Sequence, residues 1–569
     1  MELVLDEAGV RPAVSVERRR PGRGWLPVAG AAVLAVALTL RVTSRFGAGA
    51  EPDTVTYLAA AGHLRTGHGF ADIGGEPLTL FPPLFPAAVA ALEWLGLAGL
   101  SAARFLNAAM FGVLVVLAGV WARRISGSDT VAAVVAGVTA ISTPMVSMAS
   151  WALSEPVGIV AEVACLMLLT EALRGTAGAR PATGWAATGR AATGWAAAAG
   201  LAAALSCLTR YASVVLFPVG IVVLLAGPGR RAARAALAAT FAAVGAVPFG
   251  AWLVRNVIVA GNATGQGRGE SALSPFTSLK ETLAAVGAWF LPGKTPVGVE
   301  AVAGAVLCAA VAVPLVAGAV AERRRADRAG GPGLGPAGGS GLGPPGGSGL
   351  GPAGLALPAA AFVVLGVLSV AGFETAMAID PPPRFLLPVF VPLLLGAAVV
   401  VAGRSRSASS SRSGGRSGGR SVAVGLVLVV VAASLPRLVA YVERADRRGL
   451  LDYSTPRWRS SAVLDYLRTH PVHGTVVSDD PYILNLRLGV LVFPTPARTY
   501  WQSNEPTTEL PLFERRAARA QSSGGLTVVW FPGSWQPYLY RLDDLERAVC
   551  LRLERHLADG DVLRSCPSG

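Results

Sequence analysis

The segment 51–86 is unusually rich in side chains that can carry chemistry. It contains Asp53, Tyr57, His63 and His68. The spacing of four between Asp53 and Tyr57 would place both side chains on one face if the segment is helical. A carboxylate there could act as a general base that takes a proton from a hydroxyl. A second interpretation stays open, because aspartate is a preferred N-cap residue and could simply begin the helix TVTYLAAAGHL.

Three arginines, Arg210, Arg255 and Arg384, lie at or just inside the boundaries of apolar blocks. A charge near lipid costs free energy, up to about 2.5 to 3.5 kcal/mol at mid-bilayer on insertion scales, and a guanidinium there can neutralise a phosphate. The alternative for each arginine is that it reaches to lipid headgroups. Glu155 begins an apolar block, so it could belong to a site or could interact favourably with the helix dipole.

The elements that position these residues must lie in a membrane. Of the 569 residues, 52% are hydrophobic and 15% are charged, and the mean hydropathy is +0.52, whereas a soluble domain has about 25% charged residues. The net charge of +14 does not indicate nucleic-acid binding, because the arginines separate apolar blocks instead of lining an amphipathic helix. The composition predicts a polytopic α-helical membrane protein whose solvent is the lipid bilayer.

The apolar blocks have the length that a helix needs to cross about 30 Å of hydrocarbon, and they predict about eleven transmembrane helices. The predicted spans are 25–44, 101–121, 130–150, 155–173, 191–208, 211–227, 233–253, 299–321, 354–373, 385–403 and 421–441.

Arginine-rich loops give the orientation, because short cytoplasmic loops collect Lys and Arg. Every second predicted span ends at a basic loop, beginning with the one that holds Arg123 and Arg124. The N-terminus is then cytoplasmic and the C-terminal segment lies outside. Segment 81–99 is apolar but interrupted by prolines, so we expect an interfacial or re-entrant helix there; a further span would reverse the pattern.

The chain divides into three predicted parts. They are a cytoplasmic tail 1–24, a transmembrane domain 25–441 with a first outside loop 45–100 and cytoplasmic linkers 322–353 and 404–420, and an extracytoplasmic α/β domain 445–569. The linkers contain Gly- and Ser-rich repeats, which are typical of flexible segments.

In the C-terminal domain, GTVVSDD and GLTVVWFPG predict strands, while SSAVLDYLRTH and the stretch from Leu545 to Leu557 predict helices. Cys550 and Cys566 could form a disulfide if this domain is extracytoplasmic. The other three cysteines lie inside apolar blocks, where a thiol behaves as a small hydrophobic group. No cysteine spacing indicates a zinc site.

Several short motifs follow one another in a characteristic order. The first loop carries Asp53, Tyr57, Gly-His-Gly-Phe and Phe-Pro-Pro-Leu-Phe-Pro, and Leu-Ser-Glu-Pro, Thr-Arg-Tyr, Trp252 to Asn256 and Pro-Arg-Phe-Leu-Leu-Pro come later. This order resembles the GT-C superfamily of polyprenyl-phosphate-sugar-dependent glycosyltransferases over most of residues 25–441. The likeness is closest to the branch with the protein O-mannosyltransferases and the lipid A aminoarabinose transferase, glycosyltransferase family 39.

In that family the acid of the first loop is the catalytic base, a role that the resemblance places on Asp53. A polyprenyl phosphate leaves without protonation, unlike the alkoxide that a glycosidase must protonate. The remaining tasks are to deprotonate the acceptor hydroxyl and to neutralise the phosphate, with inversion at the anomeric carbon. The candidate contacts to the donor phosphate or sugar are Arg210, Arg255, Arg384, Tyr57, His68 and Glu155.

Many members of the family have two adjacent acids where this chain has Asp53-Thr54. Glu51 or Asp72 could substitute for the second acid only if the loop folds them inward. We therefore expect no metal ligands and no cofactor, with a divalent metal as the alternative.

The expected function is transfer of a hexose or pentose from a polyprenyl-phosphate carrier to a glycan, lipid or protein outside the inner (plasma) membrane. Two other classes remain open: a multi-pass transporter or flippase of a lipid-linked substrate, and a non-enzymatic envelope scaffold. A transporter should tolerate loss of Asp53 better than loss of a mid-helix charge, and a paired set of broken helices is not evident in the sequence. A scaffold predicts that the outer domain retains function alone.

Overall fold

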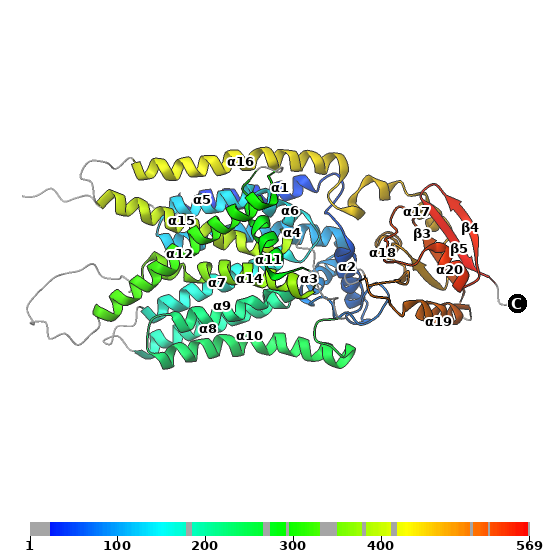
Figure 1. Cartoon of the computed structure of the whole chain (residues 1–569), viewed down its shortest axis with the longest axis horizontal. Coiled ribbons are helices and arrows are strands. Elements are labelled where there is room, and N and C mark those ends of the chain that lie inside the picture. Colours follow the sequence, from blue (N-terminus) through cyan, green and yellow to red (C-terminus); the bar gives the residue numbers. More distant parts are fainter. Residues whose placement is uncertain are drawn as a thin grey trace, which may run out of the picture.

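The structure is a computed structural model that describes residues 23–177, 185–265, 273–291, 295–329, 350–377, 383–410, 418–500, 504–521 and 524–566. A bundle of long helices forms one end of the molecule and a small α/β domain forms the other (Figure 1). Nearly all of the predicted tail 1–24, most of the linker 322–353 and the centre of the linker 404–420 lie outside the described residues.

Long apolar helices build the bundle, because their side chains can be buried against lipid and against each other. The helices of the bundle are α1 (Leu26–Val42), α4 (Gly99–Ser126), α5 (Asp129–Ile141), α6 (Thr143–Ser150), α7 (Glu155–Ala177), α8 (Trp185–Cys207), α9 (Leu216–Ala226), α10 (Arg231–Ala260), α11 (Pro275–Ala288), α12 (Val297–Ala329), α13 (Pro352–Leu355), α14 (Leu357–Met377), α15 (Leu387–Ser410) and α16 (Gly418–Arg448). Short 3-10 turns precede α1, α9 and α15, namely η1 (Arg23–Trp25), η2 (Tyr211–Val215) and η3 (Pro383–Leu386).

Among the described residues, six helices are long and apolar enough to cross a membrane, or seven if the pair α5–α6, bent by 55°, is one span. Each predicted span contains a helix of the structure, and the predicted polytopic helical architecture is confirmed. Fewer helices meet the length and hydropathy criterion than the about eleven predicted. Three of the reasons are local, since α1 and the η2–α9 segment are short and α8 is dominated by alanine and glycine. For α16, the side chains of its first half lie outside the described residues.

Helix α11 lies in a segment where no helix was predicted. Its start has the expected signals, with Ser274 accepting a hydrogen bond from the Thr277 amide and a proline at the first helical position. It packs closely on α12, since a Cβ on Gly287 would clash with the Glu300 carbonyl. Arg437 of α16 donates to the Trp289 carbonyl at 2.8 Å and so closes the C-terminal end of α11.

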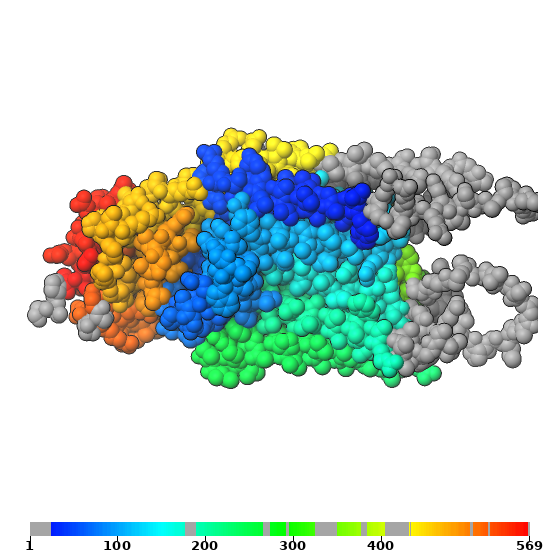
Figure 2. All heavy atoms as spheres, turned by 180° about the vertical axis from the view of Figure 1, so that it is seen from behind, coloured from blue at the N-terminus to red at the C-terminus, as the bar shows by residue number. Residues whose placement is uncertain are grey.

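Two helices of the first loop, α2 (Pro52–Arg65) and α3 (Leu84–Trp94), lie where the bundle meets the C-terminal domain (Figure 1). From behind, the atoms of the first loop, in blue, lie between the cyan and green bundle and the orange and red domain (Figure 2). With 11 residues, α3 is about 16 Å long at 1.5 Å per residue, about half of the hydrocarbon thickness. This length agrees with leaving segment 81–99 out of the spans.

The C-terminal domain is an α/β unit around one mixed sheet of five strands in the order β2-β1-β3-β5-β4. Strand β1 pairs in parallel with β2 and β3, and β5 pairs antiparallel with β3 and β4. Its elements are η4 (Asp452–Ser454), η5 (Pro456–Arg459), α17 (Ala462–Thr469), β1 (Thr475–Ser478), α18 (Pro481–Leu488), β2 (Val492–Pro494), α19 (Glu509–Gln521), β3 (Leu526–Trp530), α20 (Leu542–Ala548), β4 (Leu551–Leu557) and β5 (Gly560–Ser565).

The helix predicted from Leu545 to Leu557 is wrong in its second half. Helix α20 ends at Ala548, and residues from Leu551 form β4. The stretch pairs antiparallel with β5, and a disulfide joins the residues Cys550 and Cys566 that flank this hairpin. Pairing with β5, the next strand in the chain, outweighs the favourable helix propensity of the Leu, Arg and Glu residues in LRLERHL.

The first loop and the C-terminal domain share one hydrophobic core. Val55 and Ile73 of the loop are buried in the same cluster as Tyr453 and Ile483 of the domain. The Tyr453 amide also donates to the Ala50 carbonyl at 3.1 Å. The domain therefore holds the chain at the start of α2, where the acidic residues of the first loop stand.

Candidate active site

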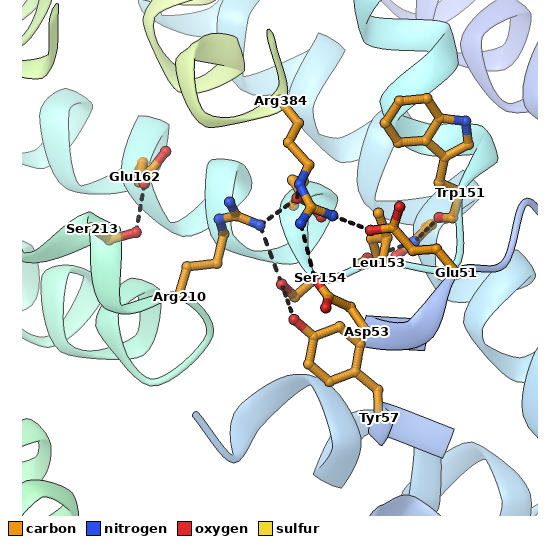
Figure 3. A network of polar contacts seen from close by, with 12 residues as sticks. Glu51, Asp53, Tyr57, Trp151, Leu153, Ser154, Glu162, Arg210, Ser213 and Arg384 are labelled. Carbon is orange, nitrogen blue, oxygen red and sulfur yellow. Dashed lines mark hydrogen bonds and ion pairs between the residues drawn. The ribbon is translucent and has the colours of Figure 1, made fainter. Parts of the chain in front are cut away.

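Five charged side chains meet at the start of α2, which lies where the bundle meets the C-terminal domain (Figure 1). Figure 3 shows Glu51, Asp53, Arg210 and Arg384 turned toward one another. The five side chains come from four separate segments of the chain: the start of α2, the start of α7, the residue before η2, and η3. We call this group the charged cluster. Its members are Glu51, Asp53, Glu155, Arg210 and Arg384.

Arg384 joins the three carboxylates. Its Nη1 pairs with Glu51, its Nη2 lies 2.9 Å from Asp53 Oδ2, and its Nε lies 3.9 Å from Glu155 Oε1. Arg210 Nη1 lies 2.5 Å from the same Glu155 oxygen. Both guanidiniums are largely buried, so water screens these interactions less than it would at the surface.

Helix α2 begins so that two acids face the cluster. Glu51 is the N-cap residue, and its backbone amide donates to Thr54 Oγ1 at 3.2 Å. Pro52 occupies the first helical position, where a missing amide costs nothing. Asp53 is therefore in the first turn and is not the N-cap, so the capping interpretation is wrong, and its carboxylate is free to pair with Arg384.

The start of α7 is fixed by contacts to its backbone. Asn107 of α4 donates its side-chain amide to the carbonyls of Trp151 at 2.7 Å and Leu153 at 2.9 Å. The backbone of Gly49 pairs with segment 150–152 on the other side. These bonds connect the residues before α7 with the residues before α2. Glu155 of α7 is thereby held close to Glu51 and Asp53 at the start of α2.

Tyr57 points into the same group of residues. Its hydroxyl lies 3.3 Å from Ser154 Oγ, and Arg210 Nη1 donates to that oxygen at 3.4 Å. The ring is buried and packs edge-on against Phe81 and Phe85. Burial and, after it, the nearby carboxylates hold the pKa of Tyr57 well above its usual range. The phenol therefore serves as a hydrogen-bonding group at neutral pH.

Glu51 is the acid whose inward orientation the sequence could not settle. The structure folds it into the cluster, whereas Asp72 accepts hydrogen bonds from the Gly74 and Glu76 amides in a turn of the loop. Burial, partly offset by Arg384, raises the pKa of Glu51 to about 7. Near neutral pH the cluster therefore alternates between a neutral state and a state with one net negative charge.

Two predicted donor contacts are directed elsewhere. Arg255 donates to the Leu78 carbonyl at 2.8 Å and lies over the Trp252 ring, 4.8 Å from its centroid. His68 is exposed in the first loop, with its Nδ1 2.8 Å from Thr66 Oγ1. Arg255 fastens the first loop to α10, and His68 lies at the surface.

Tyr211, in the Thr-Arg-Tyr motif, also connects the first loop to α10. Its hydroxyl accepts from Trp252 Nε1 at 2.8 Å and from Asn256 Nδ2 at 3.0 Å. The same hydroxyl donates to the Thr79 carbonyl at 2.9 Å. Two residues of the motif therefore have different roles. Arg210 belongs to the charged cluster, and Tyr211 binds α10 to the first loop.

A groove lined mostly by apolar side chains begins beside the charged cluster. Arg210 belongs to the cluster and lines the groove. Phe385 also lines the groove, and its ring centroid lies 5.3 Å from Arg210 Cζ and 5.5 Å from Arg384 Cζ. The other apolar side chains that line it are Ala212, Val215, Phe362, Val370, Phe373, Pro388 and Val389. The charged side chains of the cluster therefore stand directly beside a mostly apolar groove.

One acid of the groove wall was missed by the sequence analysis. Glu162 of α7 is buried and accepts a hydrogen bond from Ser213 Oγ at 2.6 Å (Figure 3). The available signal was an ionisable residue inside an apolar span, which is costly and usually functional.

Within the residues that the structure describes, no group of three or more His, Cys, Asp or Glu side chains is placed to hold a metal ion. The three carboxylates of the charged cluster are instead paired with guanidiniums. A metal ion would compete with those guanidiniums for the same oxygens.

No family model matches this sequence, and no curated protein matches it. Among solved structures, ArnT from Cupriavidus metallidurans bound to undecaprenyl phosphate is similar over 96% of this chain and 99% of its own, with 15% identity and a TM-score of 0.55. The same protein in the apo state gives 14% identity and a TM-score of 0.56 over the same shares. The Archaeoglobus fulgidus oligosaccharyltransferase in the apo form gives 12% identity and 0.51 over 90% of this chain and 70% of its own. At these identities the likeness shows the fold, which is the GT-C fold of membrane glycosyltransferases.

Proposed function

Because the chain has the GT-C fold, we propose that it is a membrane glycosyltransferase that moves a sugar from a polyprenyl-phosphate carrier to an acceptor hydroxyl at the charged cluster. One observation carries the proposal: Arg210 and Phe385 line the apolar groove and also belong to, or touch, the charged cluster. A phosphate at the two guanidiniums would have its lipid chain in the groove. A similar solved protein, ArnT, is bound to undecaprenyl phosphate.

Arg210 and Arg384 would hold the donor phosphate. Guanidiniums form paired, charge-assisted hydrogen bonds with phosphate oxygens. Both arginines now pair with carboxylates, so an entering phosphate would exchange places with some of these oxygens. The phosphate would then be neutralised before and after the bond to the sugar breaks, which stabilises it as a leaving group.

Asp53 would be the general base. Its side chain is 28% exposed, whereas that of Glu155 is 3% exposed and confined between the two guanidiniums. Glu51, whose pKa is raised to about 7, is the alternative base, because a base works best when its pKa lies near the working pH. The acceptor oxygen would attack the anomeric carbon, its proton would pass to Asp53, and the carbon–oxygen bond to phosphate would break with its electrons leaving on phosphate. Attack opposite the phosphate inverts the anomeric centre.

We place the cluster and the C-terminal domain on the outside of the inner (plasma) membrane, with the N-terminus in the cytoplasm. The placement of arginine in alternate loops supports this orientation. The acceptor would then be a glycan, lipid or protein of the envelope, and the transferred sugar a hexose or pentose.

The direct test is transfer of label from a panel of radiolabelled polyprenyl-phosphate sugars by membranes that contain the native protein, against membranes without it. Transfer from one donor supports the proposal and identifies the sugar. If no donor transfers while a labelled carrier changes leaflet in a protein-dependent way, the protein is a flippase and the proposal is wrong.

The donor KM of the native protein is expected to rise about tenfold between pH 6 and pH 8, since one added charge near the phosphate weakens its binding. The pKa of Glu51 is about 7, so the carboxyl is neutral below this pH and adds a negative charge above it. Glu51→Gln, which imitates the neutral form, should make the KM independent of pH over this range. The measurement is the donor KM at half-unit pH steps.

The matched control is Glu76→Gln, which neutralises an exposed acid of the same loop. This variant should keep the pH dependence of the native protein. If Glu51→Gln keeps it as well, another group titrates and the assignment to Glu51 fails.

Removal of divalent metals is expected to leave the transfer rate unchanged within about twofold, because the guanidiniums supply the positive charge that a metal ion provides elsewhere. Purified protein is assayed after dialysis against a chelator. Loss of the rate, with recovery on adding back one divalent cation, would show that a metal takes part.

A further inference from the structure

Glu162 is a buried acid in the wall of the groove, and one of its carboxyl oxygens is open to a ligand contact. It lies on α7 two turns after Glu155, about 10 Å further along the helix at 1.5 Å per residue. Its Oε1 accepts from Ser213 Oγ at 2.6 Å. Its Oε2 is buried and makes no hydrogen bond of standard geometry among the described residues, although the Ser206 hydroxyl lies close enough to interact with the carboxyl. The residue is 3% exposed and lines the groove.

A charged carboxylate is poorly accommodated at this position. The groove is mostly apolar, and an ionised acid without a counter-charge is costly in such surroundings. The titratable groups that face Glu162 are Arg210 and the thiols of Cys165 and Cys207. Arg210 forms its ion pair with Glu155. The neutral acid avoids the cost of an uncompensated charge, and a proton on Oε2 makes that oxygen a donor that is open to a ligand.

The side chain of Arg210 passes between the two acids of α7. A Cβ built on Gly158 would lie 3.0 Å from Arg210 Cδ, so the arginine crosses the helix at the glycine that stands between Glu155 and Glu162. Arg210 and Glu162 both line the groove, so a phosphate bound there would be within reach of both side chains. One guanidinium and one carboxylic acid then face the same anion.

We propose that Glu162 is a further donor-binding residue, whose carboxylic acid donates a hydrogen bond to a non-bridging phosphate oxygen of the polyprenyl carrier. This inference rests on the proposed function, because it needs the carrier in the groove. A neutral acid binds a phosphate anion, whereas a carboxylate would repel it. The residue thus favours a lipid whose end group is anionic over one that ends in an alcohol.

The test measures binding of the methyl phosphodiester of a long-chain polyprenol, a probe with one charge that does not titrate, to the full-length protein in nanodiscs. Loss of a hydrogen bond to a charged group weakens binding about 10- to 100-fold, which is the expected result for Glu162→Leu. Glu162→Gln keeps an N–H donor and should bind within about threefold of the native protein.

The matched control is Glu374→Leu. Glu374 is also a buried acid of the bundle, and its Oε1 accepts from Thr282 Oγ1 at 3.2 Å, but it does not line the groove. This variant should bind the probe within about threefold of the native protein. A loss as large as that of Glu162→Leu would show that any buried acid matters for folding, and would overturn the proposal.

A spectroscopic measurement separates contact from a structural role. Infrared difference spectra recorded on adding the probe should show a shift of the carbonyl stretch of a protonated carboxyl in the native protein and in Glu374→Leu. The shift should vanish in Glu162→Gln even if Glu162→Leu fails to fold. If the native protein binds the probe without this shift, the inference alone fails. If the native protein does not bind the probe at all, the proposed function fails with it.

Discussion

Replacement of Asp53 by asparagine is expected to lower kcat by about 10²- to 10⁴-fold, the usual contribution of a general base. Asparagine has nearly the same shape and can still accept a hydrogen bond from Arg384, which lies 2.9 Å from Asp53 Oδ2 in the native protein. It cannot take a proton from the acceptor hydroxyl. The donor KM should therefore change little, and the loss should fall on the chemical step.

The measurement is steady-state transfer by the purified protein with the donor that the radiolabelled panel identifies. Asp72→Asn is the matched control, because it makes the same change in the same loop and an asparagine can accept the same two backbone hydrogen bonds. Its kcat should stay near that of the native protein. Equal rates for Asp53→Asn and the native protein would remove Asp53 from the mechanism, and Glu51→Gln would then be the next variant to assay.

Replacement of Arg384 by alanine is expected to lower kcat/KM by about 10²- to 10³-fold, as loss of a residue that stabilises a developing charge does. Arg384 contacts all three carboxylates of the charged cluster. Without it, the cluster has three acids and one guanidinium, so a phosphate would meet a site with excess negative charge. Arg384→Lys should recover little, because an ammonium cannot make the paired contacts of a guanidinium.

The contrast that tests the structure is Arg255→Ala. In the sequence, Arg255 and Arg384 are alike, because both are arginines at the boundary of an apolar block. In the structure, however, Arg255 contacts the Leu78 carbonyl and the Trp252 ring. Its loss should reduce kcat/KM by less than about tenfold, with a larger effect on thermal stability. If Arg255→Ala loses as much kcat/KM as Arg384→Ala at unchanged stability, Arg255 binds the donor and the arrangement of the site proposed here is wrong.

The membrane class and the order of the helices follow from the sequence because hydropathy and helix length are properties of contiguous residues. The predicted span 155–173, for example, corresponds to α7 at Glu155–Ala177. Two local predictions went wrong or were missing for the same reason. Helix α11 packs against α12, and β4 pairs with β5, so contact with another element decides the outcome, and the residues of the segment alone do not.

The candidate site shows the same division. The sequence could provide the residue types of the site, since an acid after the first span and arginines at apolar boundaries are unusual. It could not show which of these residues meet, because Arg384 and Glu51, for example, are 333 residues apart in the chain. The inward orientation of Glu51 depends on the turn that begins α2 and on the C-terminal domain that packs against it.

The sequence by itself determined a polytopic helical protein, a separate C-terminal α/β domain and a short set of candidate acids and arginines. Only the tertiary structure decided that Arg210 and Arg384 meet Glu51, Asp53 and Glu155, that Arg255 and His68 are directed elsewhere, and that an apolar groove opens beside the cluster. The physical reason is one of range. Apolar length and helix propensity act between neighbours in the chain, whereas ion pairs form between whichever side chains the packing of distant helices brings within a few ångströms.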